Sequence, residues 1–360
     1  MYLCSKFKDD RKMKKDVKAR YLIPASLCLL VLAGLGYYYL FTSFSGGKAT
    51  SYVYIDRDDN YDSLMVKLKP LASQHGYHAF CTLARHSSLA KNVHTGRYEI
   101  SPSIGTFTLF RHIKNGMQTS MNLVVPSVRT MQDLAGKLGN KLMLDSTELA
   151  QAFTNDTLCK KYGYDTLTIS ALFIPNTYDI YWNVSLDGFM EYMQKENRKF
   201  WDDNRVAKAK RLKLTPIQVT TLASIVDEET NNNKEKPMVA GMYYNRLMFR
   251  NEKYPNGMPL QADPTIKFAW KQFELKRVYH KLLFIDSPYN TYRYPGLPPG
   301  PIRIPSVAGI DAVLDMVHHD YIYMCAKEDF SGTHNFARTY QEHLDNARRY
   351  AVALNRHGIK

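Results

Sequence analysis

The sequence predicts an α+β protein in which a single N-terminal transmembrane helix precedes a small α/β domain and a larger mixed α/β domain. No charged residue occurs between Tyr21 and Gly47, although 23% of the whole chain is charged. After that run, segments with strand-like alternation and segments with helical periodicity follow one another. With 45% hydrophobic and 12% aromatic residues among 360, the chain can bury two or three cores, which excludes a disordered protein.

The N-terminal segment has the charge pattern of a membrane anchor. Residues 1–20 hold eight Lys or Arg against three Asp, a net charge of +5. Leu22 to Phe41 is about long enough to cross a bilayer as a helix. This run is longer than the apolar part of a cleaved signal peptide, and no clear A-x-A site follows it. We therefore expect a cytoplasmic basic tail (1–20), an uncleaved transmembrane helix (21–43) and, by the positive-inside rule, an extracytoplasmic remainder.

The remainder keeps a net charge of +9, which is +14 for the whole chain minus +5 for the tail. No arginine-rich helix or RNA-binding motif accompanies this charge, so we expect an anionic polymer or membrane surface rather than nucleic acid. Cys81, Cys159 and Cys325 are widely spaced; one disulfide is possible, but a disulfide framework is excluded. His318 and His319 lack a third ligand at metal spacing, so no metal site is expected.

The extracytoplasmic part divides by pattern into a short flexible linker (44–50), a small domain (51–117) and a larger domain (118–360). The small domain should contain a strand at Ser51–Ile55, a helix over Tyr61–His75 that Pro70 can kink or end, and a strand, turn and short helix over 96–116. In the larger domain we expect a strand at Met121–Val125, helices near Arg129–Leu138, Glu148–Phe153, Leu186–Val206, Pro216–Glu229, Pro237–Phe249 and Thr339–Asn355, and a hairpin of Tyr321–Ala326 with Thr333–Ala337.

The segment 287–305 holds six prolines and two glycines, a composition that excludes a helix or a central strand. It is either an ordered surface loop or a stiff platform whose tyrosines stack on sugar rings. The sequence leaves both interpretations open.

The helix over Pro216–Glu229 has a clear start signal: Thr215 is suited to be the N-cap, Pro216 stands at the first helical position, and Gln218 can complete a capping box. Within it, Leu222, Ile225 and Val226 fall on one face.

Glu229 continues that apolar face, seven residues after Leu222, whereas Asp227 and Glu228 point sideways or away. Burial in an apolar setting raises the pKa of a carboxyl group, which suits a general acid at neutral pH. The alternative is a helix end whose acidic residues cluster by chance.

Three segments then occur in order: LASIVDEET at 222–230, LQADPT at 260–265 and SPYNTYRYPGLPPGPIRIPS at 287–306. The run YNRL lies between the first two at 244–247, and HNF follows at 334–336. Together they resemble the MltG/YceG-like family of endolytic murein transglycosylases. Three departures are Asp227 in place of the usual Glu, Ala262 in place of a small hydroxyl residue, and an insertion-like stretch over Phe249–Pro259.

The resemblance implies an enzyme anchored once in the cell inner membrane, with a LysM-like domain over 51–117 and a catalytic domain over 118–360. It implies cleavage of the MurNAc–GlcNAc β-1,4 bond of nascent peptidoglycan to leave 1,6-anhydroMurNAc ends, which would terminate strand elongation without a cofactor. The catalytic glutamate maps to Glu229, and Asp263 is the second candidate acid. Residues expected to bind or support the substrate are Asn245, Gln261, Asp263, Thr265, Tyr289, Asn290, Tyr292 and His334.

A different class of function stays open at this point: a non-catalytic protein that binds glycan strands, or peptidoglycan synthases, during wall assembly. A carboxyl group on an apolar face favours the enzyme, because a pure binding protein does not need one. A peptidoglycan amidase or peptidase would need a zinc triad or a reactive cysteine, and the sequence shows neither pattern.

Overall fold

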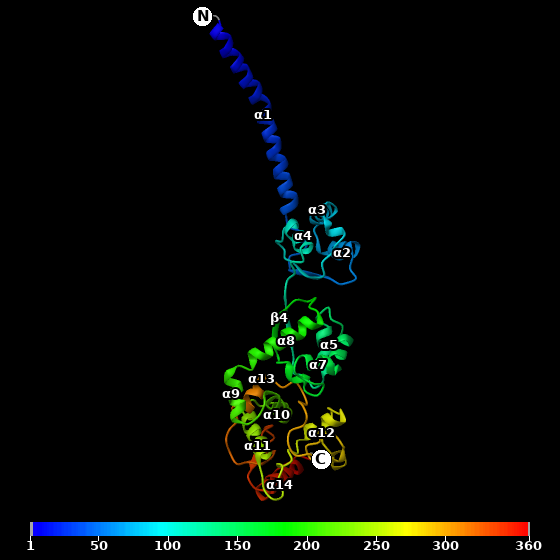
Figure 1. Ribbon diagram of the computed structural model, residues 1–360, viewed down its shortest axis with the longest axis vertical. Helices are drawn as coiled ribbons and strands as arrows, with labels where there is room; N and C mark the ends of the chain where they lie inside the picture. The colour runs from blue at the N-terminus through cyan, green and yellow to red at the C-terminus, as the bar shows by residue number, and fades with distance from the viewer. Residues whose placement is uncertain (1–2, 359–360) are drawn as a thin grey trace. The chain divides into compact units, whose positions relative to one another are not determined.

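The structure is a computed structural model that describes residues 3–358, with side chains described from residue 21 onward. The chain divides into two compact units. The first unit runs through Met121 and includes Ile180–Asn183, and the second holds Asn122–Asp179 and the chain from Val184 onward (Figure 1). Both helices and strands are present, so the predicted mixed α/β class is confirmed.

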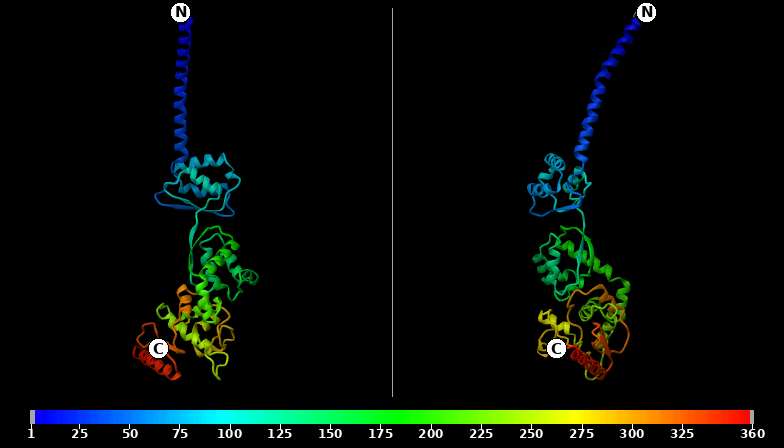
Figure 2. Two further views of the ribbon diagram at one scale, coloured as in Figure 1. Left: turned by 60° about the vertical axis from the view of Figure 1, so that its left-hand side comes forward. Right: turned by 180° about the vertical axis from the view of Figure 1, so that it is seen from behind.

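The first unit begins with the long helix α1 (Leu3–Phe41). Its portion Tyr21–Phe41 has a mean hydropathy of 1.7 and none of it is buried; Figure 2 shows most of the helix standing free, while Tyr39 and Phe41 at its end pack against His75 and Phe107. Among the described residues, this is the helix that is long and apolar enough to span a membrane. Pro24 lies inside the helix, and the whole is consistent with a single-pass anchor.

A two-stranded antiparallel sheet organises the rest of the first unit. Strand β1 (Ser51–Ile55) pairs with β2 (Gly96–Ile100), with Ser51 opposite Ile100. The other elements are α2 (Tyr61–Leu68), a 3₁₀ turn (Lys69–Leu71), α3 (Gln74–Arg85), a second 3₁₀ turn (Ser88–Ala90) and α4 (Thr106–Lys114).

The predicted helix over Tyr61–His75 is wrong in its second half, because α2 ends at Leu68. Pro70 lies in the following 3₁₀ turn, and Ser73 then caps a new helix by accepting a hydrogen bond from the Gly76 backbone N–H at 3.0 Å.

The start of the predicted flexible linker packs against the first unit. Phe44 is fully buried in the core of the first unit. Its backbone N–H donates to the carbonyl of Ile104 at 2.8 Å, and its ring lies 5.7 Å from that of Phe80. The segment from residue 44 is therefore packed against the first unit rather than free.

The second unit contains two short sheets and most of the helices. Strand β3 (Met121–Val125) neighbours β4 (Asn176–Ile180), and β5 (Tyr323–Ala326) pairs antiparallel with β6 (His334–Ala337). The helices are α5 (Met131–Gly139), α6 (Ser146–Thr154), α7 (Asp156–Lys161), α8 (Leu186–Phe200), α9 (Asp203–Arg211), α10 (Pro216–Glu229), α11 (Lys236–Met248), α12 (Asp263–Trp270), α13 (Val307–Leu314) and α14 (Tyr340–Arg356), with 3₁₀ turns at Ile169–Leu172 and His280–Phe284.

One predicted helix over Leu186–Val206 is in fact two helices. Helix α8 ends at Phe200, and the carboxylate of Asp202 starts α9 by accepting a hydrogen bond from the Arg205 N–H at 2.8 Å. A side-chain cap of this kind competes with continuation of the preceding helix, and the apolar periodicity across the break does not reveal it.

Helix α10 lies at the centre of the second core, packed against α11 and α13. Its predicted bounds and capping box are confirmed: Gln218 N–H donates to the Thr215 hydroxyl at 3.2 Å, and Thr215 N–H donates to the Gln218 side chain at 2.8 Å. Residues Val219 to Asp227 are all buried. The middle of the helix is therefore enclosed on every side rather than along one stripe, and solvent reaches only its two ends, at 216–218 and at Glu228 and Glu229.

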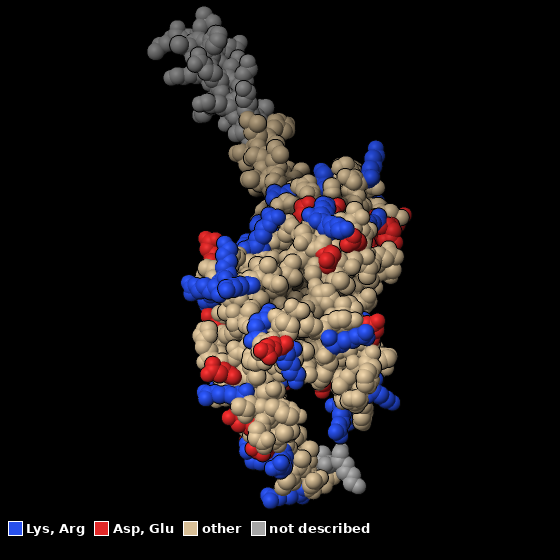
Figure 3. All heavy atoms as spheres, turned by 60° about the horizontal axis from the view of Figure 1, so that its bottom comes forward, with Lys and Arg blue, Asp and Glu red and all other residues tan. Residues whose placement is uncertain are grey.

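Two loops agree with the predicted absence of regular structure, since neither 249–259 nor 286–305 contains a helix or strand. Lys and Arg side chains are spread among Asp and Glu over the face shown in Figure 3. The net positive charge is thus not gathered into a single patch on that face.

Candidate active site

Glu229 is the last residue of α10 and keeps partial exposure to solvent. The hydroxyl of Tyr243, from the neighbouring helix α11, donates to Glu229 Oε1 at 2.6 Å. Burial is the largest influence on this carboxyl and raises its pKa above the usual value, and the charge of Asp263 acts in the same direction. The Tyr243 hydrogen bond and the positive charges of His334 and Arg246 oppose that shift without cancelling it.

His334 lies at the start of β6 and is held by a buried carboxylate. Glu235, which is 8% exposed, accepts from the His334 backbone N–H at 2.6 Å on one oxygen and contacts His334 Nδ1 at 3.2 Å with the other. The second oxygen also accepts from the Thr230 hydroxyl at 2.9 Å. Because Thr230 directly follows Glu229, this carboxylate ties the hairpin to the end of α10.

Glu229 and His334 line one cavity of about 250 Å³ together with residues of the β5–β6 hairpin and Tyr350 of α14. The structure therefore brings the predicted acid and the predicted histidine to a single open site. Its walls come from segments about 100 residues apart in sequence, which local patterns cannot join.

Arg246 places a permanent positive charge near this site. It is 7% exposed and donates to the backbone carbonyls of Leu260 and Ile322, both at 2.5 Å. Burial lowers its pKa from the usual arginine value, yet the group stays charged at any physiological pH. Neither Arg246 nor Tyr243 was predicted from the sequence as a site residue.

Asp263 and Tyr292 meet across two of the sequence motifs. The Tyr292 hydroxyl donates to Asp263 Oδ1 at 2.5 Å. Burial, the largest cause, and this carboxylate together hold the Tyr292 pKa far above its ordinary value, so Tyr292 remains a donor. Asp263 is exposed at the first turn of α12. Its charge raises the pKa of Glu229, and the charge of Glu229 raises the pKa of Tyr292.

Three predicted substrate-binding residues instead hold the backbone. Asn245 donates through its amide to two carbonyls ahead of β5, at 2.6 and 3.0 Å. Asn290 is fully buried and donates to two carbonyls of the preceding turn, both at 2.8 Å. Thr265 is fully buried and donates to a carbonyl within its own helical turn at 2.7 Å. Their donors are occupied, so they shape the site rather than offer free groups.

The remaining two predicted residues, Gln261 and Tyr289, are not among the residues that line the Glu229 cavity. Gln261 is exposed, with a left-handed backbone (φ 50°) and its N–H donating to the carbonyl of Thr291 at 3.0 Å. Tyr289 is 9% exposed, packs 4.7 Å from the ring of Phe268, and lines a different cavity from Glu229.

The two acids before Glu229, which we expected to point sideways or away from the apolar stripe, are both paired with cations. Asp227 is 6% exposed; it pairs with Lys236 Nζ at 2.8 Å and accepts from the Ser306 N–H at 2.5 Å. Glu228 accepts two hydrogen bonds from Arg129, at 2.8 and 2.9 Å, and one from Arg303 at 2.8 Å. Both carboxylates are held in ion pairs, whereas Glu229 has none with any side chain that the structure describes.

Within the described residues, no group of three or more His, Cys, Asp and Glu could hold a metal ion. Cys81, Cys159 and Cys325 are free thiols in this part of the chain, so the disulfide that the sequence left open is not formed. The site's chemistry therefore rests on carboxyl, hydroxyl, imidazole and guanidinium groups.

Comparison with known proteins gives a consistent picture. The model of the YceG-like family matches residues 53–349. The endolytic murein transglycosylase of Bacillus subtilis strain 168 is 31% identical over 209 residues, which cover 58% of this chain and 54% of that protein. The protein of the same name from Streptococcus pneumoniae serotype 2 strain D39 is 23% identical over 278 residues, or 69% of this chain and 49% of that protein.

The chain thus spans about half the length of the curated relatives it matches. A crystal structure of a yceG-like protein from Listeria monocytogenes superposes with a TM-score of 0.51 and 25% identity, covering 83% of this chain and 99% of that one.

Proposed function

The chain belongs to the YceG-like family, and from that premise we propose that it is an endolytic lytic transglycosylase. Its substrate is peptidoglycan (murein), as the name of the related Bacillus and Streptococcus proteins suggests, and the bond that we propose it cuts is the MurNAc–GlcNAc β-1,4 bond. The observation that carries the proposal is Glu229: a carboxyl with a raised pKa, in a cavity, bonded among the described residues to a single hydroxyl.

In the first step Glu229 acts as a general acid. The Tyr243 hydroxyl occupies Oε1, so the transferable proton lies on Oε2 and faces the leaving glycosidic oxygen. As the bond between C1 and that oxygen breaks, the proton moves to the oxygen and Glu229 becomes a carboxylate. The positive charge of Arg246, which lowers the pKa of Glu229, stabilises this carboxylate once it forms.

In the second step the same carboxylate acts as a general base. It takes the proton of the MurNAc C6 hydroxyl while that oxygen forms the bond to C1, which closes the 1,6-anhydro ring. Glu229 ends protonated, as it began, and no water enters the product. Asp263, positioned by Tyr292, lies near enough to affect the ionisation of Glu229 and stabilises the positive charge that develops at C1.

Oxygen-18 water tests the reaction type. The full-length protein in detergent is given peptidoglycan in labelled water, and the products are analysed by mass spectrometry. We expect unlabelled 1,6-anhydroMurNAc ends. One labelled oxygen per cut would instead identify a hydrolase, with Asp263 as the first candidate for its second carboxylate.

For the first unit we propose a LysM-like, glycan-binding role and an extracytoplasmic location. The element order β1, α2, α3, β2 gives a small sheet with two helices between its strands, and α1 precedes it as the anchor in the inner membrane. A reporter that is active only outside the cytoplasm, fused after Lys360, should be active. An inactive fusion at normal expression would place the catalytic domain in the cytoplasm and overturn this orientation.

The alternative, a non-catalytic glycan-binding or assembly protein, is disfavoured because such a protein has no use for an enclosed carboxyl whose pKa burial raises. Peptidoglycan synthases stay a predicted class of partner under either function. The two functions separate in one comparison: Glu229→Gln should retain binding to peptidoglycan sacculi and lose all anhydro-ended product, whereas a binding protein would form no such product before the change either.

A further inference from the structure

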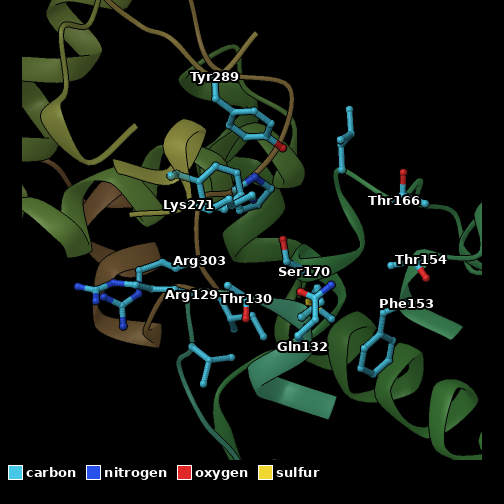
Figure 4. Close-up of a pocket in the computed structure, with 16 residues that line it drawn as sticks. Arg129, Thr130, Gln132, Phe153, Thr154, Thr166, Ser170, Lys271, Tyr289 and Arg303 are labelled. Carbon is cyan, nitrogen blue, oxygen red and sulfur yellow. The ribbon is translucent and has the colours of Figure 1, made fainter. Parts of the chain in front are cut away.

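A second cavity, of about 200 Å³, lies in the second unit between the start of α5, the 3₁₀ turn at Ile169–Leu172, and the loop that carries Tyr289 (Figure 4). It does not include Glu229. Three cationic residues, Arg129, Lys271 and Arg303, line it, and no Asp or Glu is among its lining residues. The mechanism proposed above does not use this cavity.

The cations around this cavity are only partly neutralised. Glu228 pairs with both Arg129 and Arg303, at 2.8 Å each. Lys271 has no ion-pair partner among the described residues, and its Nζ lies 3.6 Å from the centre of the Phe268 ring. The charge of Glu274 also raises the pKa of Arg129, so Lys271 is the one of these three cations that no carboxylate among the described residues offsets.

Lys271 is also held in a costly conformation. It adopts a left-handed backbone with φ 55° at the end of α12, a region that residues other than Gly, Asn and Asp seldom occupy. Burial lowers the pKa of its ammonium group, because no nearby carboxylate offsets the loss of water. An anionic ligand would supply the missing partner.

Two buried polar atoms in the cavity wall lack hydrogen-bond partners. Ser170 is 8% exposed, and its hydroxyl is unpaired among the described residues; the same is true of Arg303 Nε. In Figure 4 the Ser170 hydroxyl points toward the side of the cavity formed by Tyr289 and Lys271. Buried groups of this kind are nearly always paired, so their position indicates a ligand with polar atoms.

We infer that this cavity binds the acidic peptide carried by peptidoglycan strands, with a peptide carboxylate between Lys271 and Arg303 and near the Ser170 hydroxyl. The inference rests on the proposed function for its choice of ligand. It makes the cavity a substrate-recognition site separate from the cleavage site, so that strands with attached peptides are preferred over bare glycan.

The separation between the two sites suits a short peptide. Helix α12 begins at Asp263, beside the cleavage site, and ends next to Lys271. Its eight residues span about 12 Å at 1.5 Å each, and an extended peptide of three or four residues reaches about 10 to 14 Å. A peptide attached to a sugar bound near Glu229 can therefore place its carboxylate in this cavity.

Direct binding tests the cavity without cleavage. The probe is an N-acetylated tripeptide with two free carboxylates, compared with its dimethyl ester by calorimetry on the full-length protein in detergent. We expect the acid to bind and the ester to bind at least about tenfold more weakly. Inorganic phosphate that binds as well as the acid, or equal binding of the ester, would overturn the inference.

Two variants with one matched control locate the binding. Lys271→Met should weaken tripeptide binding about tenfold or more, while Lys267→Met, on the same helix but outside the cavity lining, should leave it unchanged. Ser170→Ala should weaken binding without lowering the melting temperature, because no hydrogen bond within the protein is lost. A lower melting temperature with unchanged binding would show that Ser170 is only structural and contradict its assignment.

Cleavage of two substrates then separates this inference from the proposed function. Intact strands are compared with strands stripped of peptides by an amidase. We expect the wild type to have the higher kcat/KM on intact strands and Lys271→Met to lose that preference, with unchanged cleavage of bare strands. Equal use of both substrates by the wild type overturns the inference alone. If neither is cleaved, the proposed function fails, and the tripeptide measurement still decides on the cavity.

Discussion

Two carboxylates near the C-terminal end of α10 have opposite surroundings. Asp227 lies in a closed junction with α13, where Lys236 is 2.8 Å away and Ser306 donates to it through both its N–H at 2.5 Å and its hydroxyl at 3.1 Å. Glu229, two residues later, faces a cavity and receives a single hydrogen bond. Residues two apart point about 200° from each other on a helix. One turn of α10 can therefore direct Asp227 into the junction with α13 and Glu229 into the cavity.

The contrast shows what makes a carboxyl group available for acid catalysis. Asp227 has a cation and two donors from Ser306 within hydrogen-bond distance, so fixed partners already occupy its oxygens. Glu229 is enclosed without that support, and its pKa is raised. The shortage of hydrogen-bond partners around the Glu229 carboxyl is therefore what suits it to acid catalysis. This shortage is tolerated because Glu229 lies at the partly exposed end of α10, and the buried part of the helix does not depend on it.

The largest expected effect is the loss of catalysis in Glu229→Gln. The amide keeps the size of the side chain but can neither give nor take the proton, so the rate should fall by about 10²–10⁴ or more. Release of anhydro-ended products from sacculi measures this loss. Glu191→Gln, an exposed residue of α8, is the matched control. Substantial activity in a normally folded Glu229→Gln protein would remove Glu229 from the mechanism.

The junction at Asp227 should respond in stability instead. Asp227→Ala leaves Lys236 buried without its ion-pair partner, which costs about 3–5 kcal/mol of unfolding free energy. Urea denaturation measures the loss. The double variant Asp227→Ala/Lys236→Met should recover part of it, because the unpaired buried charge is gone. A stability close to that of the wild type in Asp227→Ala would mean that the pair is not the closed junction described above.

These two residues also show what sequence can and cannot predict. The bounds of α10 follow from local chemistry, namely the Thr215 cap, Pro216 and the capping box with Gln218, and the family resemblance agrees with the apolar-face argument for Glu229. The same argument has Asp227 pointing sideways or away from the apolar stripe, and it does not reveal that this side chain is buried against α13. Its partner Ser306 lies 79 residues away, and no local period contains that information.

The roles of the motif residues also depend on tertiary contacts that the sequence does not show. Asn290 and Thr265 look like ligand-binding groups in the sequence, but the structure uses their donors to hold backbone carbonyls. Conversely, Tyr243 looks like an ordinary helical aromatic, and only the packing of α11 on α10 brings its hydroxyl to Glu229. A polar residue's role depends on what lies opposite it, which requires the tertiary structure.

A smaller effect is expected from Tyr243→Phe, which removes the single donor to Glu229. The rate should fall about tenfold, the loss expected for one hydrogen bond to a charged group. Because the Tyr243 bond lowers the pKa of Glu229, its removal should also shift the declining, high-pH limb of the activity profile to higher pH. Tyr244→Phe is the control, since that hydroxyl donates to the carbonyl of Leu212 instead. An unshifted limb would show that the hydroxyl does not influence the acid.

The smallest effect is a pH-dependent difference in stability between the wild type and Glu229→Gln. The folded-state pKa of Glu229 is raised above 4.5, so below that pH both the folded and the unfolded wild type hold the proton. As pH rises from 4.5 to the raised value, the unfolded chain releases its proton first, and the wild type loses stability relative to the glutamine variant. Above the raised pKa the difference becomes constant.

Melting temperatures of both proteins across this range test the sign directly. Glu229→Gln should gain on the wild type with rising pH and then hold its advantage. A difference that moves the opposite way would mean that Glu229 is stabilised as a carboxylate, like Asp227. In that case Glu229 could not be the proton donor at neutral pH. The difference between the surroundings of Asp227 and Glu229 would then not explain catalysis.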